Sequence, residues 1–208
     1  MNEIKTIVWD LGGVYFTRGS YLAIERIIDI YEIDDRDLVY QTFSSKYKEE
    51  GFKIRLGLIT MDEFEESFFE KIDVKESNKK HIRNIWFGSY VPHFKIENVV
   101  RELSEKYRLL IFSGNIKERI QFLDERYDFL QYFDEYIFSY DFQMNKNDIK
   151  FHKTLLEYIE CEPSETLVID DEKRNVNMSK QLGMNGILYY YLEQLLGELK
   201  KYNIKVNI

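Results

Sequence analysis

The stretch Ile4–Gly13, IKTIVWDLGG, decides how this chain folds. β-branched and aromatic residues run up to Trp9, and an acid and two glycines follow shortly after, which predicts a buried strand ending in a loop that carries Asp10. In a doubly wound α/β domain, ligands bind beyond the carboxyl ends of such strands. Asp10 is therefore the first candidate for a functional residue, although an aspartate after a strand also serves as a helix cap or a turn residue.

Two further apolar runs end in small polar or acidic residues. The run 108–112 leads into Ser-Gly-Asn at 113–115, and the run 166–169 leads into Asp-Asp at 170–171. A segment that opens with Lys146 lies between these two runs. The chain thus presents Asp, Ser, Lys and Asp-Asp in this order, each acid or hydroxyl at the end of a predicted strand.

This order resembles the motifs of the haloacid dehalogenase superfamily of phosphohydrolases, and the resemblance covers nearly the whole chain. In that superfamily the first motif supplies a nucleophilic aspartate, the second a Ser or Thr, the third a lysine, and the fourth an acidic pair followed by Asn or Asp. The matching residues here are Asp10, Ser113, Lys146, Asp170, Asp171 and Asn175.

The resemblance implies a magnesium site. Two carboxylates at neighbouring strand ends repel each other unless a cation lies between them, and Mg²⁺ prefers oxygen ligands. The ligands implied are an oxygen of Asp10, the backbone carbonyl of Gly12 and the side chain of Asp171, with Asp170 and Asn175 in support. A second interpretation of the acidic pair is that it caps the helix that follows.

The resemblance also implies a mechanism. Asp10 attacks the phosphorus of a small phosphorylated substrate, and water then hydrolyses the aspartyl-phosphate. Lys146 offsets the charge of the phosphate, and Ser113 with Gly114 and Asn115 binds the phosphoryl oxygens.

Lys146 competes for the lysine role with two other residues of the same segment, Lys150 and Lys153. We prefer Lys146 because it opens the segment at a separation from Asp170 that is typical of the family. Asn147 stands where the family usually has a proline, which loosens the loop and leaves the amine in place.

Gly12 is the main departure from the family pattern. Most phosphatases of this superfamily carry a second aspartate at this position, which protonates the leaving group and later activates water. Such acid-base help is worth about 10²–10⁴ in rate. We therefore expect good leaving groups to be favoured, unless another group such as Tyr15 or a cap residue donates the proton. Thr17 and Arg18 also follow the loop closely enough to contact a substrate.

The remaining pattern predicts an α/β fold. From residue 95 onward, predicted helices alternate with strands, as in a parallel sheet with helices on both faces. The resemblance adds a Rossmann-like, doubly wound strand order with the first strand central and the fourth-motif strand beside it. Residues 20–88 carry helical signals only, among them a helix over 34–47, a capping box at Thr60 and Glu63, and a helix capped by Ser77.

The predicted organisation is a core formed by residues 1–16 and 89–208, with an inserted all-helical cap at 17–88. His81, His93 and His152 lie in different predicted elements without metal-ligand spacing, so surface or core roles are expected for them.

Composition limits the partners. With 208 residues and a net charge of −8, the chain should repel nucleic acid and anionic membranes. The chain has a single cysteine, Cys161, no signal-peptide core in residues 1–5 and no run of ~20 apolar residues, which predicts a cytoplasmic protein. We expect it to be a monomer or a homodimer.

Three functions remain open from the sequence. The first is a Mg²⁺-dependent phosphatase for a small metabolite, favoured by Lys146, Asp171 and Asn175. The second is a non-catalytic protein that binds a phosphorylated ligand or a protein partner, favoured by Gly12. The third is a dehalogenase in which Asp10 attacks carbon, a reaction that needs no metal and leaves the acidic pair unexplained.

Overall fold

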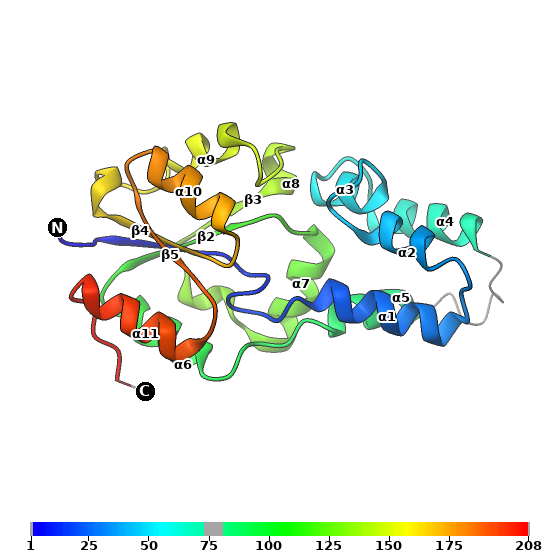
Figure 1. Cartoon of the computed structure of the whole chain (residues 1–208), viewed down its shortest axis with the longest axis horizontal. Helices are drawn as coiled ribbons and strands as arrows, with labels where there is room; N and C mark the ends of the chain where they lie inside the picture. Colours follow the sequence, from blue (N-terminus) through cyan, green and yellow to red (C-terminus); the bar gives the residue numbers. More distant parts are fainter. Residues whose placement is uncertain (1, 73–80, 208) are drawn as a thin grey trace.

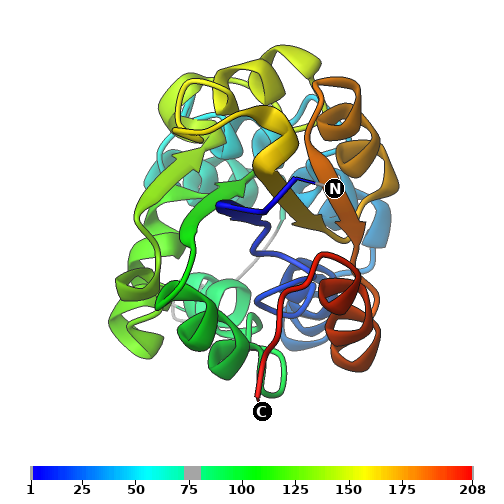
Figure 2. The ribbon, with the colours of Figure 1, turned by 90° about the vertical axis from the view of Figure 1, so that its left-hand side faces the viewer.

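The fold is built on a five-stranded parallel sheet, seen from two directions in Figures 1 and 2. The computed structural model describes residues 2–72 and 81–207. The strand order is β3-β2-β1-β4-β5. The strands are β1 (Thr6–Trp9), β2 (Arg108–Ser113), β3 (Glu135–Phe138), β4 (Thr166–Asp170) and β5 (Asn185–Leu188). The predicted central position of the first strand, with the fourth-motif strand beside it, is confirmed.

The side chains of β1 alternate between two apolar layers, as the two-residue period of a strand requires. Ile7 and Trp9 belong to the larger cluster, and Val8 belongs to the smaller one with Leu110 and Val168. None of these five side chains is more than 1% exposed. Burial on both faces explains why this strand is an almost continuous apolar run.

Helices cover both faces of the sheet. In Figure 2, α9 and α10 lie on one face, and α6, α7 and α11 lie on the other. This arrangement confirms the Rossmann-like α/β fold. The bounds are α6 (Ile96–Ser104), α7 (Lys117–Tyr127), α9 (Ile149–Leu155), α10 (Lys173–Gln181) and α11 (Leu192–Lys201).

Within the described residues, five more helices, α1 to α5, lie between β1 and α6 in the chain and beside the sheet domain in space (Figure 1). They pack around buried aromatic rings, among them Phe43, Phe64, Phe68 and Trp86. The division of the chain into a core and a cap stays a prediction. The helices are α1 (Gly19–Tyr31), α2 (Arg36–Phe43), α3 (Glu50–Arg55), α4 (Met61–Lys71) and α5 (Ile82–Gly88).

Two connections join these helices to the sheet domain, and they are paired with each other. The amide of Thr17 donates to the carbonyl of Val91 at 2.9 Å, and the amide of His93 donates to the carbonyl of Tyr15 at 2.8 Å. The hydroxyl of Thr17 also donates to the carbonyl of Ser89 at 3.2 Å. The chain therefore leaves and re-enters the sheet domain side by side.

The predicted capping box is confirmed. The Thr60 hydroxyl accepts a hydrogen bond from the Glu63 amide at 3.2 Å, and the Glu63 carboxylate accepts from the Thr60 amide at 2.7 Å. The predicted cap at Ser77 lies outside the described residues, and the second half of the helix predicted to follow it lies in α5. None of the described helices has both the length and the apolar character needed to cross a bilayer.

Several elements are shorter than predicted. The helix expected over 34–47 is only α2. The Asp35 side chain caps its start by accepting from the Leu38 amide, and the extended backbone of Ser44 ends it. The helix expected from Asp148 to about 160 ends at Leu155, after which the amides bond three residues back, as in a tight turn. Two short helices, α3 and α8 (Ser139–Phe142), were not predicted individually.

Candidate active site at the carboxyl edge of the sheet

The ends of three neighbouring strands bring the predicted residues together. Asp10 directly follows β1, Ser113 is the last residue of β2, and Asp170 is the last residue of β4. Trp9 is level with Ile111 of β2 and Ile169 of β4, so all three ends meet at one edge of the sheet. The edge predicted to carry the site is therefore the one at which these side chains meet.

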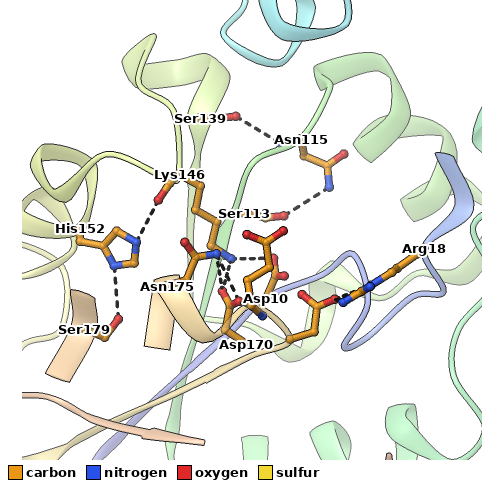
Figure 3. A network of polar contacts seen from close by, with 12 residues as sticks. Asp10, Arg18, Ser113, Asn115, Ser139, Lys146, His152, Asp170, Asn175 and Ser179 are labelled. Carbon is orange, nitrogen blue, oxygen red and sulfur yellow. Dashed lines mark hydrogen bonds and ion pairs between the residues drawn. The ribbon is translucent and has the colours of Figure 1, made fainter. Parts of the chain in front are cut away.

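Lys146 lies between two of the carboxylates (Figure 3). Its Nζ atom is 2.7 Å from Asp10 Oδ1 and 2.7 Å from Asp170 Oδ2. The lysine is buried, and burial alone would lower its pKa, but Asp10 and Asp170 outweigh this effect and raise the pKa above its ordinary value. The amine therefore stays charged at the centre of the site.

His152 holds the lysine segment in place, a contact that the sequence did not predict. Its Nε2 atom is 3.0 Å from the carbonyl of Lys146, and its Nδ1 atom is 3.2 Å from the hydroxyl of Ser179 (Figure 3). A carbonyl only accepts, so Nε2 carries the proton and Nδ1 accepts from Ser179. Burial, with the nearby charge of Lys146, lowers the pKa of His152 to about 4. The ring is neutral and structural.

Three carboxylates form a cluster that fits a divalent cation. One oxygen each from Asp10, Asp170 and Asp171 can be chosen so that all lie within 4.8 Å of one another. Burial, with the charges of the other two aspartates, raises the pKa of Asp10, although Lys146 opposes this. A hard cation would relieve the repulsion among these oxygens, and oxygen is the ligand atom that Mg²⁺ prefers.

Asn175 fixes one member of the cluster. Its amide nitrogen donates to both carboxylate oxygens of Asp170, each at 3.2 Å, and the Glu172 amide donates to Asp170 Oδ1 at 2.7 Å. Asp170 is 1% exposed, so these bonds and Lys146 satisfy a carboxylate that has lost its water. The predicted supporting roles of Asp170 and Asn175 agree with this geometry and remain to be tested.

Asp171 is paired with Arg18, which the sequence placed near the loop. Arg18 Nη2 is 2.5 Å and its Nε 2.7 Å from Asp171 Oδ2. Gly13 makes room for this carboxylate, since a Cβ atom there would lie 2.0 Å from Asp171 Oδ2, and its φ of +93° suits glycine. The second glycine of the loop is thus a requirement of the acidic cluster.

Gly12 has no such constraint. A Cβ atom at this position would meet nothing nearer than Cε1 of Tyr90, at 4.0 Å, and Gly12 is absent from the glycines with positive φ. The loop therefore has space for a side chain here. The role of the Gly12 carbonyl as a metal ligand stays a prediction.

The second-motif residues are linked to each other. The Asn115 side chain donates to Ser113 Oγ at 3.4 Å, while its backbone amide donates to Ser139 Oγ at 3.1 Å (Figure 3). That amide is therefore already engaged, which leaves the hydroxyl of Ser113 and the backbone of Gly114 as predicted phosphate ligands. A Cβ atom on Gly114 would lie 3.6 Å from Cβ of Lys146, so the second and third motifs pack together.

A cavity of about 350 Å³ opens above these residues. Its walls include Asp10, Lys146 and Asp171 from the sheet domain and Ser20, Arg55 and other residues from the helices between β1 and β2. Tyr90 and Arg119 also line it, and sequence reasoning missed both of them and Arg55. No local pattern marks these three residues, because they come from separate segments.

Tyr15 is not part of this cavity, so the expectation that it could contact a substrate or donate a proton is wrong. Its side chain is fully buried, and its ring packs against Phe16, Phe129 and Phe133. The ring packs into the aromatic layer beneath the loop, because its burial there removes a large apolar area from water.

Comparison with known families agrees with the motifs. The family model described as haloacid dehalogenase-like hydrolase matches residues 21–189. The chain belongs to this family. Among curated proteins, an uncharacterised protein of Dictyostelium discoideum is 28% identical over 169 residues, which cover 79% of this chain and 70% of that protein.

Solved structures of other haloacid dehalogenase-like proteins share the fold. One is a family enzyme from Bacteroides thetaiotaomicron in complex with magnesium and inorganic phosphate, with a TM-score of 0.75 and 24% identity, covering 92% of this chain and 98% of that one. Another is an L-2-haloacid dehalogenase from Xanthobacter autotrophicus with chloropropionic acid covalently bound, with a TM-score of 0.64 and 16% identity, covering 95% and 83%.

Proposed function

We propose that this haloacid dehalogenase-like hydrolase is a Mg²⁺-dependent phosphatase that acts on a small phosphorylated metabolite through Asp10. The observation that carries the proposal is the position of Lys146, whose amine contacts Asp10 and Asp170 at 2.7 Å each. A phosphate that approaches a carboxylate nucleophile is repelled by it, and a buried cation beside that nucleophile offsets the repulsion.

Asp10, Lys146 and Ser113 have separate roles in the proposed reaction. A carboxylate oxygen of Asp10 attacks phosphorus, the bond from phosphorus to the ester oxygen breaks, and the departing oxygen takes its proton from water, because Gly12 supplies none. Water then attacks the aspartyl-phosphate, which releases inorganic phosphate and restores the carboxylate. Lys146 orients Asp10, and the hydroxyl of Ser113 is placed to donate a hydrogen bond to a phosphoryl oxygen.

The acidic cluster supports the proposed cofactor. Asp10, Asp170 and Asp171 would hold Mg²⁺, and the Gly12 carbonyl follows Asp10 closely enough in the chain to join them. When bound, the ion would supply positive charge to the phosphoryl oxygens. The fold similarity to a protein that was solved with magnesium and inorganic phosphate agrees with this assignment.

A second candidate is a protein that binds a phosphorylated ligand without turning it over. Gly12 favours it, since no side chain at this position can protonate a leaving group. A metal-free dehalogenase is disfavoured by the acidic cluster, because Lys146 and Arg18 alone would offset only part of the repulsion among three close carboxylates.

A screen of phosphorylated metabolites with and without Mg²⁺ separates these functions. We expect phosphate release that requires the metal. Tight binding of a phosphorylated compound without release in either condition would select the second candidate, and halide release from 2-chloropropionate in the presence of a chelator would select the third.

A further inference from the structure

Two arginines from distant segments face the same cavity as the proposed phosphate site. Arg55 ends α3 among the helices between β1 and β2, and Arg119 lies in α7 of the sheet domain. Their guanidinium carbons are 5.6 Å and 5.8 Å from the centre of the Trp86 ring. Arg119 also lies 4.3 Å from the centre of the Tyr90 ring, and its side chain is almost fully buried.

Neither arginine has a charged partner. Within residues 2–72 and 81–207, no carboxylate is within 4.0 Å of either guanidinium group. Arg119 donates to the side chain of Asn115 at 2.7 Å and to the Tyr90 hydroxyl at 2.9 Å. Arg55 donates to Ser20 Oγ at 3.2 Å and to the backbone carbonyls of Phe43 and Gly51.

This arrangement is costly without a ligand for Arg119, which is 2% exposed, and less costly for Arg55, which is half-buried. Buried charges are ordinarily paired, because removing them from water costs several kcal/mol each. Burial lowers the pKa of Arg55 to about 10, and the nearby positive charge of Arg119 contributes. The chain has 37 acidic residues and a net charge of −8, so the absence of a counter-ion here is a local feature of the cavity.

The pair lies beside the proposed phosphate site and is distinct from it. Asn115 connects the two, since its side chain contacts Ser113 Oγ at 3.4 Å and Arg119 Nε at 2.7 Å. A phosphate bound at Ser113 and Lys146 would therefore leave the arginines facing the other end of the substrate. Arg119 Nη2 has no hydrogen bond to any described residue, so it can donate to a ligand.

We infer that Arg55 and Arg119, with the hydroxyls of Tyr90 and Ser20 beside them, form a second anion subsite that binds a carboxylate or a second phosphate on the leaving group. Guanidinium groups match the geometry of both anions by donating paired hydrogen bonds. The inference rests on the proposed function and narrows its substrates to small phosphate monoesters with a second negative group.

The test compares 4-carboxyphenyl phosphate with 4-carbamoylphenyl phosphate. The two esters have similar size and leaving groups of similar acidity, and they differ by one negative charge. We expect kcat/KM to favour the carboxylate by about tenfold or more, the factor that one charge-assisted hydrogen bond supplies. The net charge of the protein acts in the opposite direction, so such a preference must arise locally.

Three variants test whether the two arginines cause the preference for the carboxylate ester. Arg55→Gln and Arg119→Gln should each bring the ratio of the two kcat/KM values towards one. Lys117→Gln is the matched control, because it removes one positive charge from the same helix at an exposed position outside the cavity, and it should leave the ratio unchanged. A melting curve for each variant identifies any loss of folding. 1,4-Phenylene bisphosphate, compared with the carboxylate, shows which anion fits better.

The outcomes for the subsite and for the phosphatase differ. Equal rates for the carboxylate, the carboxamide and the bisphosphate in the wild-type protein would overturn the subsite while leaving the phosphatase in place. Hydrolysis of none of them would argue against the phosphatase, and calorimetric titration with the intact esters then tests the subsite directly. Equal affinities for the charged and neutral esters, or a preference that survives in the Arg55→Gln, Arg119→Gln double variant, would overturn it.

Discussion

The amine of Lys146 lies 2.7 Å from Oδ1 of Asp10, at the centre of the carboxyl edge of the sheet. The same amine is shared with Asp170, also at 2.7 Å. The proposed nucleophile is thus oriented before any substrate arrives, and a change at Asp10 leaves Lys146 with one carboxylate partner. Asp10 can therefore be mutated without leaving the amine of Lys146 unpaired.

The first prediction concerns the nucleophile. Asp10→Asn should abolish hydrolysis of aryl phosphates, because the amide has the shape of the carboxylate but is a poor nucleophile. The fold should persist, since Asp170 still neutralises Lys146. Steady-state rates and a melting curve check both parts. Activity near the wild-type level in a folded Asp10→Asn protein would remove this residue from the mechanism.

The second prediction concerns the cation site. Asp171→Ala should weaken Mg²⁺ binding at least tenfold, because it removes one of three clustered carboxylates. Arg18→Gln should strengthen binding by up to about fivefold, since an exposed ion pair of this kind is worth at most about 1 kcal/mol.

The measurement for this pair is the rise in melting temperature with Mg²⁺ concentration, which reports binding without turnover. A loss of Mg²⁺ affinity in Asp171→Ala would identify a ligand of the ion. A gain in affinity in Arg18→Gln would identify a cation that competes with Mg²⁺ for Asp171. A melting temperature that ignores millimolar Mg²⁺ in the wild-type protein would contradict the proposed cofactor.

The third prediction concerns pH and stability. Folded His152 stays neutral down to about pH 4, whereas an unfolded histidine takes up a proton near pH 6.5. Between these values the unfolded state binds more protons, so the free energy of unfolding should fall as the pH falls, by up to about 1.4 kcal/mol per pH unit. The contribution of the buried neutral ring is complete above pH 6.5.

Urea unfolding of wild type and His152→Gln from pH 7.5 to 4.5 isolates this effect. The variant should be less stable at neutral pH, because it loses well-packed contacts with Lys146 and Ser179. It should also show a flatter dependence on pH. Parallel pH curves for the two proteins would mean that folding leaves the proton affinity of His152 unchanged.

The fourth prediction concerns the leaving group. Gly12→Asp should speed hydrolysis of primary alkyl phosphates by up to about 10²–10⁴, because it restores an acid next to the nucleophile. Aryl phosphates, whose leaving groups need less help, should gain much less. The loop has room for the side chain, since the nearest atom to an added Cβ is 4.0 Å away.

Gly13→Ala is the control for the same loop. Its Cβ atom would lie 2.0 Å from Asp171 Oδ2 on a backbone with φ of +93°, so we expect a lower melting temperature and no gain in rate. Similar rates for alkyl and aryl phosphates in the wild-type protein would show that another group already donates the proton, and Gly12→Asp would then add nothing.

Three of the motif residues could be predicted because each stands at the end of a regular pattern. Asp10, Ser113 and Asp170 stand at the ends of short apolar runs that are typical of buried strands, and parallel strands place their carboxyl ends together. The position of Lys146 needed the family resemblance, since local pattern alone does not separate it from Lys150 or Lys153.

The arginine pair could not be predicted from pattern. Arginine is rarely buried, so its periodicity says little about the core, and Arg119 reads as one more charge on an amphipathic helix. Arg55 reaches the cavity only through the packing of α3. Tyr15 was wrongly expected to reach the site. It lies close to Asp10 in the sequence, but its ring packs into the aromatic layer below the loop.

The paired connections at Thr17 and Val91 have a mechanical consequence. Since the two are hydrogen-bonded side by side, the described part of helices α1 to α5 is joined to the sheet domain by two chain connections at one place, and an outward movement of these helices would pivot there. Such a movement would break the hydrogen bonds that join Met61 to Glu118 and Arg55 to Ser139, and it would carry Arg55 away from Arg119. A leaving group that contacts both arginines would therefore hold these helices close to the sheet domain. Its departure would free the helices to move outward at the moment when the product must leave the cavity.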